Sequence, residues 1–186
     1  MIKRLVQTIR LNTILSARKR AEWLRKKKIF YEMGEDVSLQ LHKIPLYPEC
    51  IAFHNNIVIA SGVGFVTHDA IHAVLSKMPG NKKYIENVGC IEIMDNCFVG
   101  ANSLIMPNVR IGPNAIVAAG SIVLGDVPPN SIVGGAPAKI IGRFDEMVKN
   151  RQQMELAPDI TPPYGQKMPE ETVEYYWEKF RKKRDE

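Results

Sequence analysis

Residues 91–126 read IEIMDNCFVGANSLIMPNVRIGPNAIVAAGSIVLGD, and this stretch contains a repeat six residues long. One position in each repeat holds a β-branched aliphatic residue, and the position two places before it holds a small residue in most repeats. The position three places after it holds a residue of a type that tolerates positive φ. The aliphatic positions are Ile93, Val99, Ile105, Ile111, Val117 and Val123. The small-residue positions are Ile91, Cys97, Ser103, Val109, Ala115 and Ser121. The turn positions are Asn96, Asn102, Asn108, Asn114, Gly120 and Asp126.

This repeat predicts an all-β solenoid. A chain that turns after every short strand, with branched side chains inside each corner, builds a triangular prism from three parallel sheets, with about three repeats in each coil. An antiparallel sandwich would turn roughly every 8–12 residues, so the six-residue spacing argues against that alternative. Cys97 occupies an interior position and is expected in the core rather than as a nucleophile.

The repeat is less regular towards the N-terminus. The same aliphatic register is predicted at Leu39, Ile51, Ile57 and Val63, with His54, Ala60 and Val66 in the turn positions. Pro45 interrupts this register. The pattern stops after VGFVTH at 63–68, so residues 69–87 are predicted to form a loop outside the coil that begins just after His68.

The composition is that of a single globular domain. With 186 residues, of which 45% are hydrophobic and 24% charged, the chain is long enough to bury one core. No apolar run approaches the ~18 residues of a transmembrane helix, and Arg10 and Asn12 interrupt the apolar start before a signal-peptide core can form. The three cysteines lack metal-ligand spacing and fit a reducing compartment. We therefore expect a cytoplasmic protein.

Positive charge is concentrated at the N-terminus, where residues 1–30 contain ten Lys or Arg against Glu22 alone. A helical region is predicted here, with one apolar stripe formed by Ile2, Leu5, Val6 and Ile9. The stripe either caps the open end of the solenoid, which we favour, or contacts an anionic inner-membrane surface. Nucleic-acid binding is not predicted, because no recognisable motif or interleaved aromatic residues accompany the charge.

The sequence pattern changes after residue 142, and this change separates a β-helix domain at 31–142 from a C-terminal helical extension at 143–186. Helices are expected near 144–154 and 170–183, joined by a linker that contains Pro158, Pro162, Pro163 and Pro169. The second helix carries an apolar stripe that we expect to pack against the oligomer. The stripe consists of Val173, Tyr176, Trp177 and Phe180.

Four short motifs are specific enough to indicate a family. They are VGANS at 99–103, AGSIV at 119–123, DVPP at 126–129 and GAPAK at 135–139. Together they resemble the hexapeptide-repeat acyltransferases, especially the galactoside and maltose O-acetyltransferases and related sugar or capsule acetyltransferases. The resemblance spans residues 51–141. It implies a left-handed parallel β-helix, a homotrimer, and active sites in clefts between neighbouring prisms.

The resemblance also identifies His68 as the candidate catalytic base. The galactoside and maltose enzymes place their catalytic histidine at a coil exit of this kind, and an imidazole can take the proton of an acceptor hydroxyl as it attacks a thioester. Asp69 is a weaker candidate for orienting His68 or contacting substrate, because adjacent residues of an extended segment point to opposite faces. No metal site is predicted, since His68 and His72 would need a helix to share a face and none is signalled.

The family implies that coenzyme A lies along the outer wall of the prism. The positions that match its contacts are Ala101, Ala119 and Gly120 for the pantetheine, Phe98 beside the acyl group, and Lys139 or Arg143 for the phosphates. Small residues let the backbone approach a ligand, although they equally fill a narrow coil. The chain departs from the family in one place, because VLGD at 123–126 replaces the usual VTKD and removes a threonine and a lysine that help to hold coenzyme A.

The sequence therefore predicts an acyltransferase that moves an acetyl group from acetyl-CoA to a hydroxyl, or an amine, of a sugar acceptor in polysaccharide biosynthesis. No metal cofactor is expected. Two alternatives remain, a non-catalytic trimeric scaffold at a membrane surface and a zinc-dependent enzyme similar to γ-carbonic anhydrase. The latter needs three histidines on zinc, and the four histidines of the chain include two in its less regular half.

Overall fold

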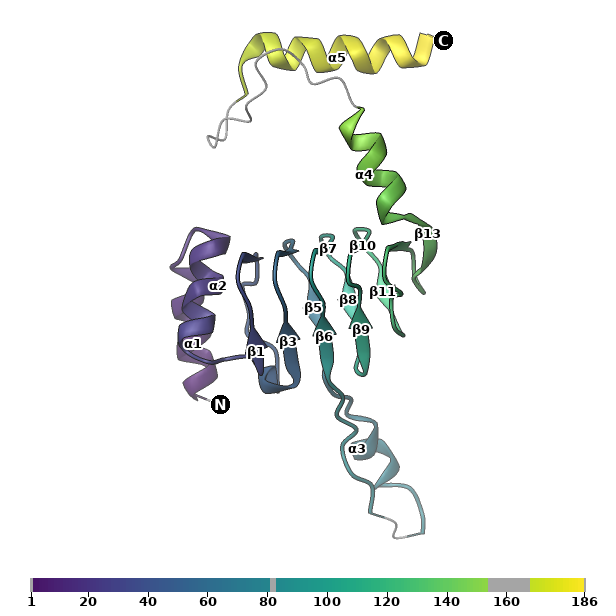
Figure 1. Ribbon diagram of the computed structural model, residues 1–186. Helices are drawn as coiled ribbons and strands as arrows, with labels where there is room; N and C mark the ends of the chain where they lie inside the picture. Colours follow the sequence, from purple (N-terminus) through teal and green to yellow (C-terminus); the bar gives the residue numbers. More distant parts are fainter. Residues whose placement is uncertain (1, 81–82, 154–167, 186) are drawn as a thin grey trace. The chain divides into compact units, whose positions relative to one another are not determined.

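The computed structural model describes residues 2–80, 83–153 and 168–185, and its central part is a parallel β-helix (Figure 1). Three sheets form the walls of the prism. Sheet A contains β1 (Glu32–Met33), β3 (Ile51–Phe53), β6 (Ile91–Ile93) and β9 (Val109–Ile111). Sheet B contains β2 (Val37–Leu39), β4 (Ile57–Ile59), β7 (Cys97–Val99), β10 (Ala115–Val117), β12 (Ser131–Gly134) and the antiparallel β13 (Lys139–Arg143). Sheet C contains β5 (Gly64–Phe65), β8 (Leu104–Ile105) and β11 (Ile122–Val123).

The strand pairing agrees with the predicted coil length. Ile91 pairs in parallel with Val109, and Cys97 pairs with Ala115. Each pair is eighteen residues apart, which is three repeats. Residues three repeats apart therefore lie one above the other along the prism.

The predicted turn residues form most of the corners, with φ between 53° and 71°. Those with positive φ are Asn96, Asn102, Asn108, Asn114 and Gly120. At the corner between sheets A and B, Asn56 Nδ2 donates to Asn96 Oδ1 at 2.7 Å, and Asn96 Nδ2 donates to Asn114 Oδ1 at 2.8 Å. Asp126 differs from the prediction, because its φ is not positive and its carboxylate instead accepts a hydrogen bond from the backbone N–H of Arg110.

The predicted register is wrong by two residues over residues 51–63, whereas Leu39 lies in the predicted aliphatic column, because it pairs with Ile59 and Ile59 pairs with Val99. Ile57 of β4 pairs with Cys97, two residues before the expected partner Val99. The residues displaced in this way are Ile51, Ile57 and Val63. Because residues two apart in a strand face the same side, the aliphatic pattern fits either register. The corners decide between them, and they are formed by Asn56 and Gly62 rather than by His54, Ala60 and Val66.

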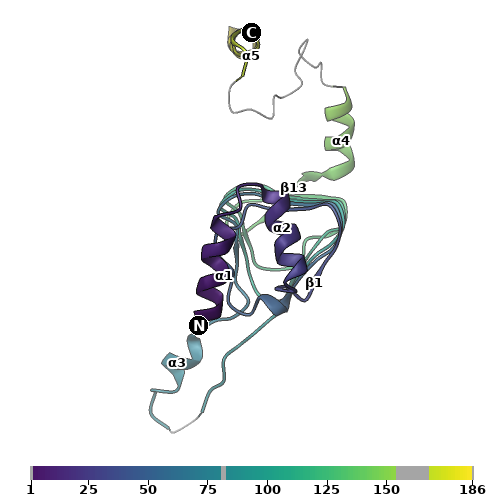
Figure 2. The same cartoon turned by 90° about the vertical axis from the view of Figure 1, so that its left-hand side faces the viewer.

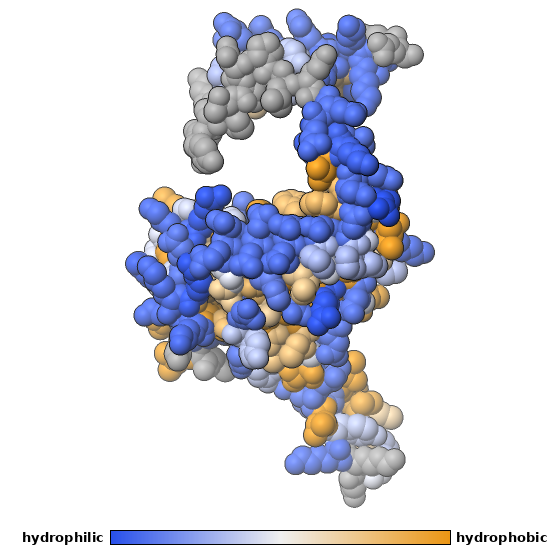
Figure 3. Space-filling view, in the orientation of Figure 1, coloured by the Kyte–Doolittle hydropathy of each residue, from blue (hydrophilic) through white to orange (hydrophobic). Residues whose placement is uncertain are grey.

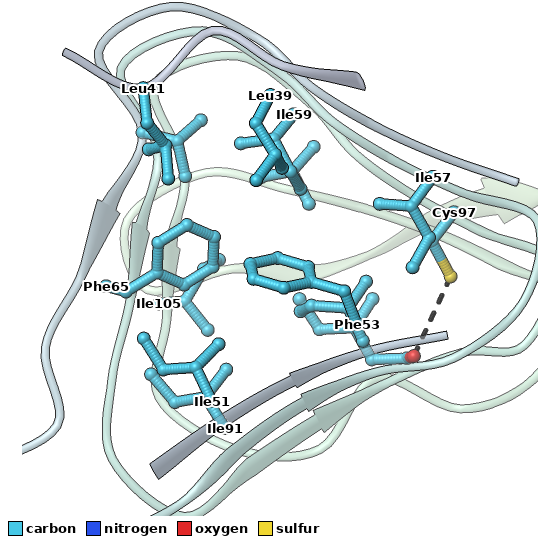
Figure 4. Close-up of a cluster of buried hydrophobic side chains, with 14 of the residues drawn as sticks. Leu39, Leu41, Ile51, Phe53, Ile57, Ile59, Phe65, Ile91, Cys97 and Ile105 are labelled. Atoms are coloured by element: carbon cyan, nitrogen blue, oxygen red, sulfur yellow. Dashed lines mark hydrogen bonds between the residues drawn. The ribbon is translucent and has the colours of Figure 1, made fainter. Parts of the chain in front are cut away.

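The interior of the prism is mostly apolar (Figure 4). Phe53 lies between Phe30 and Phe65, with edge-to-face ring contacts at centroid distances of 5.0 and 5.5 Å. Cys97 is buried, its thiol donates to the carbonyl of Ile111 at 3.7 Å, and burial raises the pKa of the thiol to about 11. A buried thiol with a raised pKa is unreactive, so Cys97 is confirmed as a core residue.

Two N-terminal helices, α1 (Ile2–Asn12) and α2 (Ala17–Lys26), lie across the end of the prism (Figure 2). Leu11 of α1 and Ala21 and Leu24 of α2 are buried in the same hydrophobic cluster as Leu39 of β2. The first coil is thus covered by apolar side chains from both helices.

The apolar stripe predicted to make this cap is not the surface used, and that part of the prediction is wrong. Its side chains, Ile2, Leu5, Val6 and Ile9, are 58–79% exposed. Polar contacts fix the opposite face of α1 against the protein, because Asn12 Nδ2 donates to the carbonyl of His42 at 2.7 Å and Thr8 Oγ1 accepts a hydrogen bond from the backbone N–H of Ile44. The stripe therefore faces outward.

The structure describes three further helices. The short helix α3 (Ile71–Leu75) belongs to the loop after β5, and α4 (Phe144–Gln152) and α5 (Glu170–Asp185) follow β13. Pro158, Pro162 and Pro163 lie outside the described residues. The apolar stripe of α5 includes an edge-to-face contact between Trp177 and Phe180. In the described part of the chain, no helix has the length and hydropathy needed to span a membrane.

Candidate active site

His68 stands at the corner where the chain leaves the coil after β5. Phe65 pairs with Ile105, so His68 occupies the same place in its coil as Asn108 occupies in the next one. In the register that the structure shows, the corner residues of this coil are Asn56, Gly62 and His68. The sequence pattern had predicted Val66 at the corner that His68 occupies.

Backbone pairing closes the base of the loop that begins here. His68 and Val88 form an antiparallel bridge, and the N–H of Asp69 donates to the carbonyl of Asn87 at 3.1 Å. The carboxylate of Asp69 accepts hydrogen bonds from the backbone N–H of Ile71 at 2.9 Å and from the amide of Asn87 at 3.2 Å. Asp69 thus fastens the two ends of the loop to each other.

A hollow of about 420 Å³ opens beside His68. Most of its wall is apolar and is formed by Leu41, Pro45, Leu46, Val63, Gly64 and Phe65. Arg4 from α1 and Lys43 from the segment after β2 also line it. The imidazole therefore faces a mainly apolar space with two cationic side chains on its border.

Glu86 and Tyr47 supply the polar surroundings of His68, and neither was predicted. Glu86 Oε1 lies 4.0 Å from His68 Nε2, while Glu86 Oε2 accepts a hydrogen bond from the Tyr47 hydroxyl at 2.8 Å. The Tyr47 ring contacts the imidazole edge-to-face, with 5.3 Å between ring centres. Hydrogen bonding to Glu86 raises the pKa of Tyr47, which keeps this hydroxyl a donor. A loop that leaves and re-enters the coil at one corner must bring residues 86–88 beside His68. The predicted end of the loop could therefore have indicated that Glu86 lies near His68.

His72 lies on α3, a helix that the sequence reasoning did not predict. Because α3 begins three residues after His68, the two imidazoles are not on one helix. The Nδ1 atoms of both histidines are buried without a hydrogen-bond partner. His42 and His54 are hydrogen-bonded to an asparagine and a glutamate elsewhere. Among the residues that the structure describes, no group of three His, Cys, Asp or Glu side chains is arranged to hold a metal ion.

The residues matched to coenzyme A lie on other parts of the prism. Phe98 points outward from β7 on sheet B and is 41% exposed. The corner between sheets B and C holds Ala101, Ala119 and Gly120. Backbones are close together at this corner, since a Cβ on Gly100 would lie 2.5 Å from the amide nitrogen of Ala119. His68 stands at a different corner, between sheets C and A.

Lys139 shares a second hollow with the two residues that depart from the family pattern. Leu124, Gly125 and Lys139 are among the residues around a space of about 400 Å³. The alternative cation, Arg143, donates two hydrogen bonds to Asp145, at 2.8 and 3.1 Å, and this pairing lowers the pKa of Asp145 to about 2. Lys139 is therefore better placed than Arg143 to bind a ligand phosphate.

Comparison with known proteins identifies the family. The family described as "Bacterial transferase hexapeptide (six repeats)" matches residues 91–125. The "Putative acetyltransferase YvoF" of Bacillus subtilis (strain 168) is 32% identical over 128 residues, which cover 67% of this chain and 67% of that protein. The chain belongs to the hexapeptide-repeat acyltransferase family. Membership of this family implies the left hand of the β-helix that the motifs predicted.

A second relative of this hexapeptide-repeat protein matches over a shorter stretch. The 2,3,4,5-tetrahydropyridine-2,6-dicarboxylate N-acetyltransferase of Clostridium perfringens (strain SM101 / Type A) is 46% identical over 65 residues. Those residues cover 35% of this chain and 27% of that enzyme. The chain thus spans about a quarter of that relative's length.

Solved structures of hexapeptide-repeat enzymes share the fold. Galactoside acetyltransferase in complex with coenzyme A matches with a TM-score of 0.56 and 24% identity, covering 80% of this chain and 82% of that chain. The hexapeptide-repeat acetyltransferase VCA0836 of Vibrio cholerae matches with a TM-score of 0.54 and 23% identity, covering 76% of this chain and 89% of that chain. At these identities the likeness concerns the fold.

Proposed function

We propose that this protein transfers an acetyl group from acetyl-CoA to a hydroxyl, or an amine, of a sugar acceptor, with His68 as the general base. The observation that carries the proposal is the position of His68 at the corner where the coil opens, beside a hollow of about 420 Å³ and 4.0 Å from Glu86. Relatives named as acetyltransferases support the acetyl donor, and they include an N-acetyltransferase as well as a galactoside enzyme.

The reaction requires one proton transfer on each side of the acetyl group. The acceptor oxygen bonds to the acetyl carbon as His68 takes its proton, the bond from carbon to sulfur then breaks, and the proton passes to the departing sulfur. Glu86 stabilises the positive charge that the imidazole gains, and Tyr47 holds Glu86 in place. A base placed in this way accelerates such a reaction by ~10²–10⁴.

We place the complete site between two copies of the chain in a homotrimer. Within one prism, His68 and the small residues matched to coenzyme A stand at different corners, at the two edges of sheet C, whereas two prisms side by side can bring such corners together. The loop after His68 also exposes apolar side chains that a neighbouring copy would cover (Figure 3). These side chains are Ile71, Val74, Met78, Ile85 and Val88, which are 43–84% exposed in the single chain.

The donor binds along the other side of this cleft. Phe98 offers an apolar surface to the acetyl group, and the backbone near Ala101, Ala119 and Gly120 is accessible to the pantetheine amides. Lys139 and Gly125 line the same hollow. The ammonium of Lys139 can therefore replace the lysine that the family usually has at the position of Gly125.

Arg4 and Lys43 indicate the charge of the acceptor. Both side chains border the hollow beside His68, where an anionic group could bind them while an adjacent hydroxyl reaches the imidazole. We therefore propose an acceptor that carries a carboxylate or a phosphate, such as an acidic or nucleotide-linked sugar. Neutral sugars are expected to react more slowly.

A thiol-release assay with acetyl-CoA and a panel of neutral, amino, acidic and nucleotide-linked sugars tests the proposal. We expect acceptor-dependent release of coenzyme A from the wild type, and a loss of ~10²–10⁴ in His68→Ala. His54→Gln is the matched control, because His54 is bonded to Glu92 on sheet A and lies outside the hollow. A His68→Ala variant as active as this control would exclude His68 as the base, and the absence of thiol release from the whole panel would contradict the acetyl transfer itself.

A further inference from the structure

The outward face of α1 carries a stripe of large apolar side chains. Ile2, Leu5, Val6 and Ile9 recur at helical spacing, so they project from one side of the helix. They are 79, 60, 58 and 59% exposed. Leu15, in the turn after α1, is 91% exposed. The cap of the prism uses the other side of the helix, through Leu11, so the stripe is not needed to cover the first coil.

The segment that carries this stripe is rich in positive charge. Residues 1–30 contain ten Lys or Arg and one Glu. Those whose side chains are described as exposed are Arg10, Arg18, Lys19, Lys26, Lys27 and Lys28. Among the described side chains of this segment, Arg25 forms an ion pair, with Glu35. On the face seen in Figure 3, the surface over these helices is mostly hydrophilic.

We propose that residues 2–28 bind a membrane surface that contains anionic lipid. α1 lies in the plane of the interface, with its apolar stripe among the upper acyl chains and the surrounding cations among the phosphates. The structure supports this occupant because the same segment combines an exposed apolar stripe with a large excess of positive charge.

Charge also argues against a second copy of the chain as the occupant. Two copies joined through this stripe would bring two segments together that each carry ten cations against one acid, and like charges in proximity repel. An anionic lipid surface covers the apolar side chains and neutralises the cations at the same time. A nucleic acid would neutralise the cations but leave the apolar stripe in water.

Membrane binding through α1 would also place the candidate active site close to the membrane surface. Arg4 is on the same helix as the stripe and lines the hollow beside His68. A protein bound through α1 therefore keeps this hollow close to the membrane surface, where acceptors attached to lipid are concentrated. The membrane proposal does not depend on catalysis, so it can be tested even if the acetyl transfer is wrong.

Vesicle co-sedimentation of the full chain tests the proposal. We expect binding to vesicles of phosphatidylcholine with phosphatidylglycerol, weaker binding at high salt, and little binding to phosphatidylcholine alone. Lys26→Gln with Lys27→Gln should weaken binding by about thirtyfold, and Leu5→Ser with Ile9→Ser should abolish it. All four side chains are exposed, so circular dichroism and the melting temperature should stay as in the wild type.

The matched control is Lys182→Gln with Lys183→Gln on α5, which removes two exposed cations outside residues 2–28. It should bind vesicles as the wild type does. An equal loss of binding in the control would overturn the assignment to residues 2–28. Wild-type vesicle binding by the Leu5 and Ile9 variant would overturn it too, and a changed mass of that variant in light scattering would then identify a second copy as the occupant.

Discussion

Replacement of Glu86 by glutamine tests how the surroundings of His68 contribute to catalysis. The change removes a negative charge 4.0 Å from His68 Nε2 and keeps an oxygen that can accept the hydrogen bond of Tyr47. Two unit charges at this distance interact by about 1 kcal/mol in water and about 4 kcal/mol at an effective dielectric constant of 20. Because the His68 and Glu86 side chains are 28% and 30% exposed, we take the lower half of this range, about 1–2 kcal/mol.

That energy stabilises the imidazolium as it forms, so its loss should lower kcat/KM by about 5- to 30-fold. The assay is acceptor-dependent thiol release at saturating acetyl-CoA, compared with the melting temperature to show that folding is intact. Glu49→Gln is the matched control, because Glu49 is an exposed carboxylate near Tyr47 that makes no ion pair with His68. A Glu86→Gln variant within twofold of the wild type, or no less active than Glu49→Gln, would refute the reasoning.

Three further predictions concern the prism. Ile105→Ala should destabilise the fold by about 2–5 kcal/mol in urea unfolding, because Ile105, on the central strand of sheet C, is fully buried in the core of the prism. A cost below about 1 kcal/mol would contradict close packing there. The thiol of Cys97 should resist alkylation at pH 8 until the protein unfolds, whereas exposed Cys90 should react at once, as mass spectrometry can show. Arg110 and His54 lower the pKa of Glu92 from its ordinary value of 4.5. Glu92 should therefore contribute its full stabilisation at a pH above 4.5, and this contribution should be lost as the pH falls through the lowered pKa. Glu92→Gln should flatten that acid limb of the melting curves, and an unchanged limb would contradict the assignment.

The corners show why part of the fold could be predicted and part could not. From Asn96 to Gly120 the turn residues are asparagine or glycine at regular spacing, and the structure confirms the coil they predicted. In the first half the prediction followed the aliphatic residues alone, and these fit two registers because both inward-facing columns are apolar there. Asn56 and Gly62 would have resolved the choice.

The N-terminal stripe shows a second limit of sequence reasoning. Hydrophobic periodicity correctly indicated a helix with an apolar face, but α1 has two faces that could have met the prism. The hydrogen bonds of Thr8 and Asn12 with the segment after β2 fix which face turns inward, and Leu11 is the apolar side chain that α1 buries. Such contacts between residues some thirty positions apart leave no periodic pattern in the sequence.

The sequence by itself determined the repeat, and with it the prism, the corners from Asn96 to Gly120 and the exit of the loop at His68, because these depend on spacing along one chain. Only the tertiary structure decided what surrounds His68. Tyr47 and Glu86 approach it from segments 21 and 18 residues away in either direction, and the backbone pairing at the loop base brings Glu86 beside it. A local period encodes where a strand turns, whereas the contacts that make a histidine a useful base come from chain segments that meet only after the coil has closed.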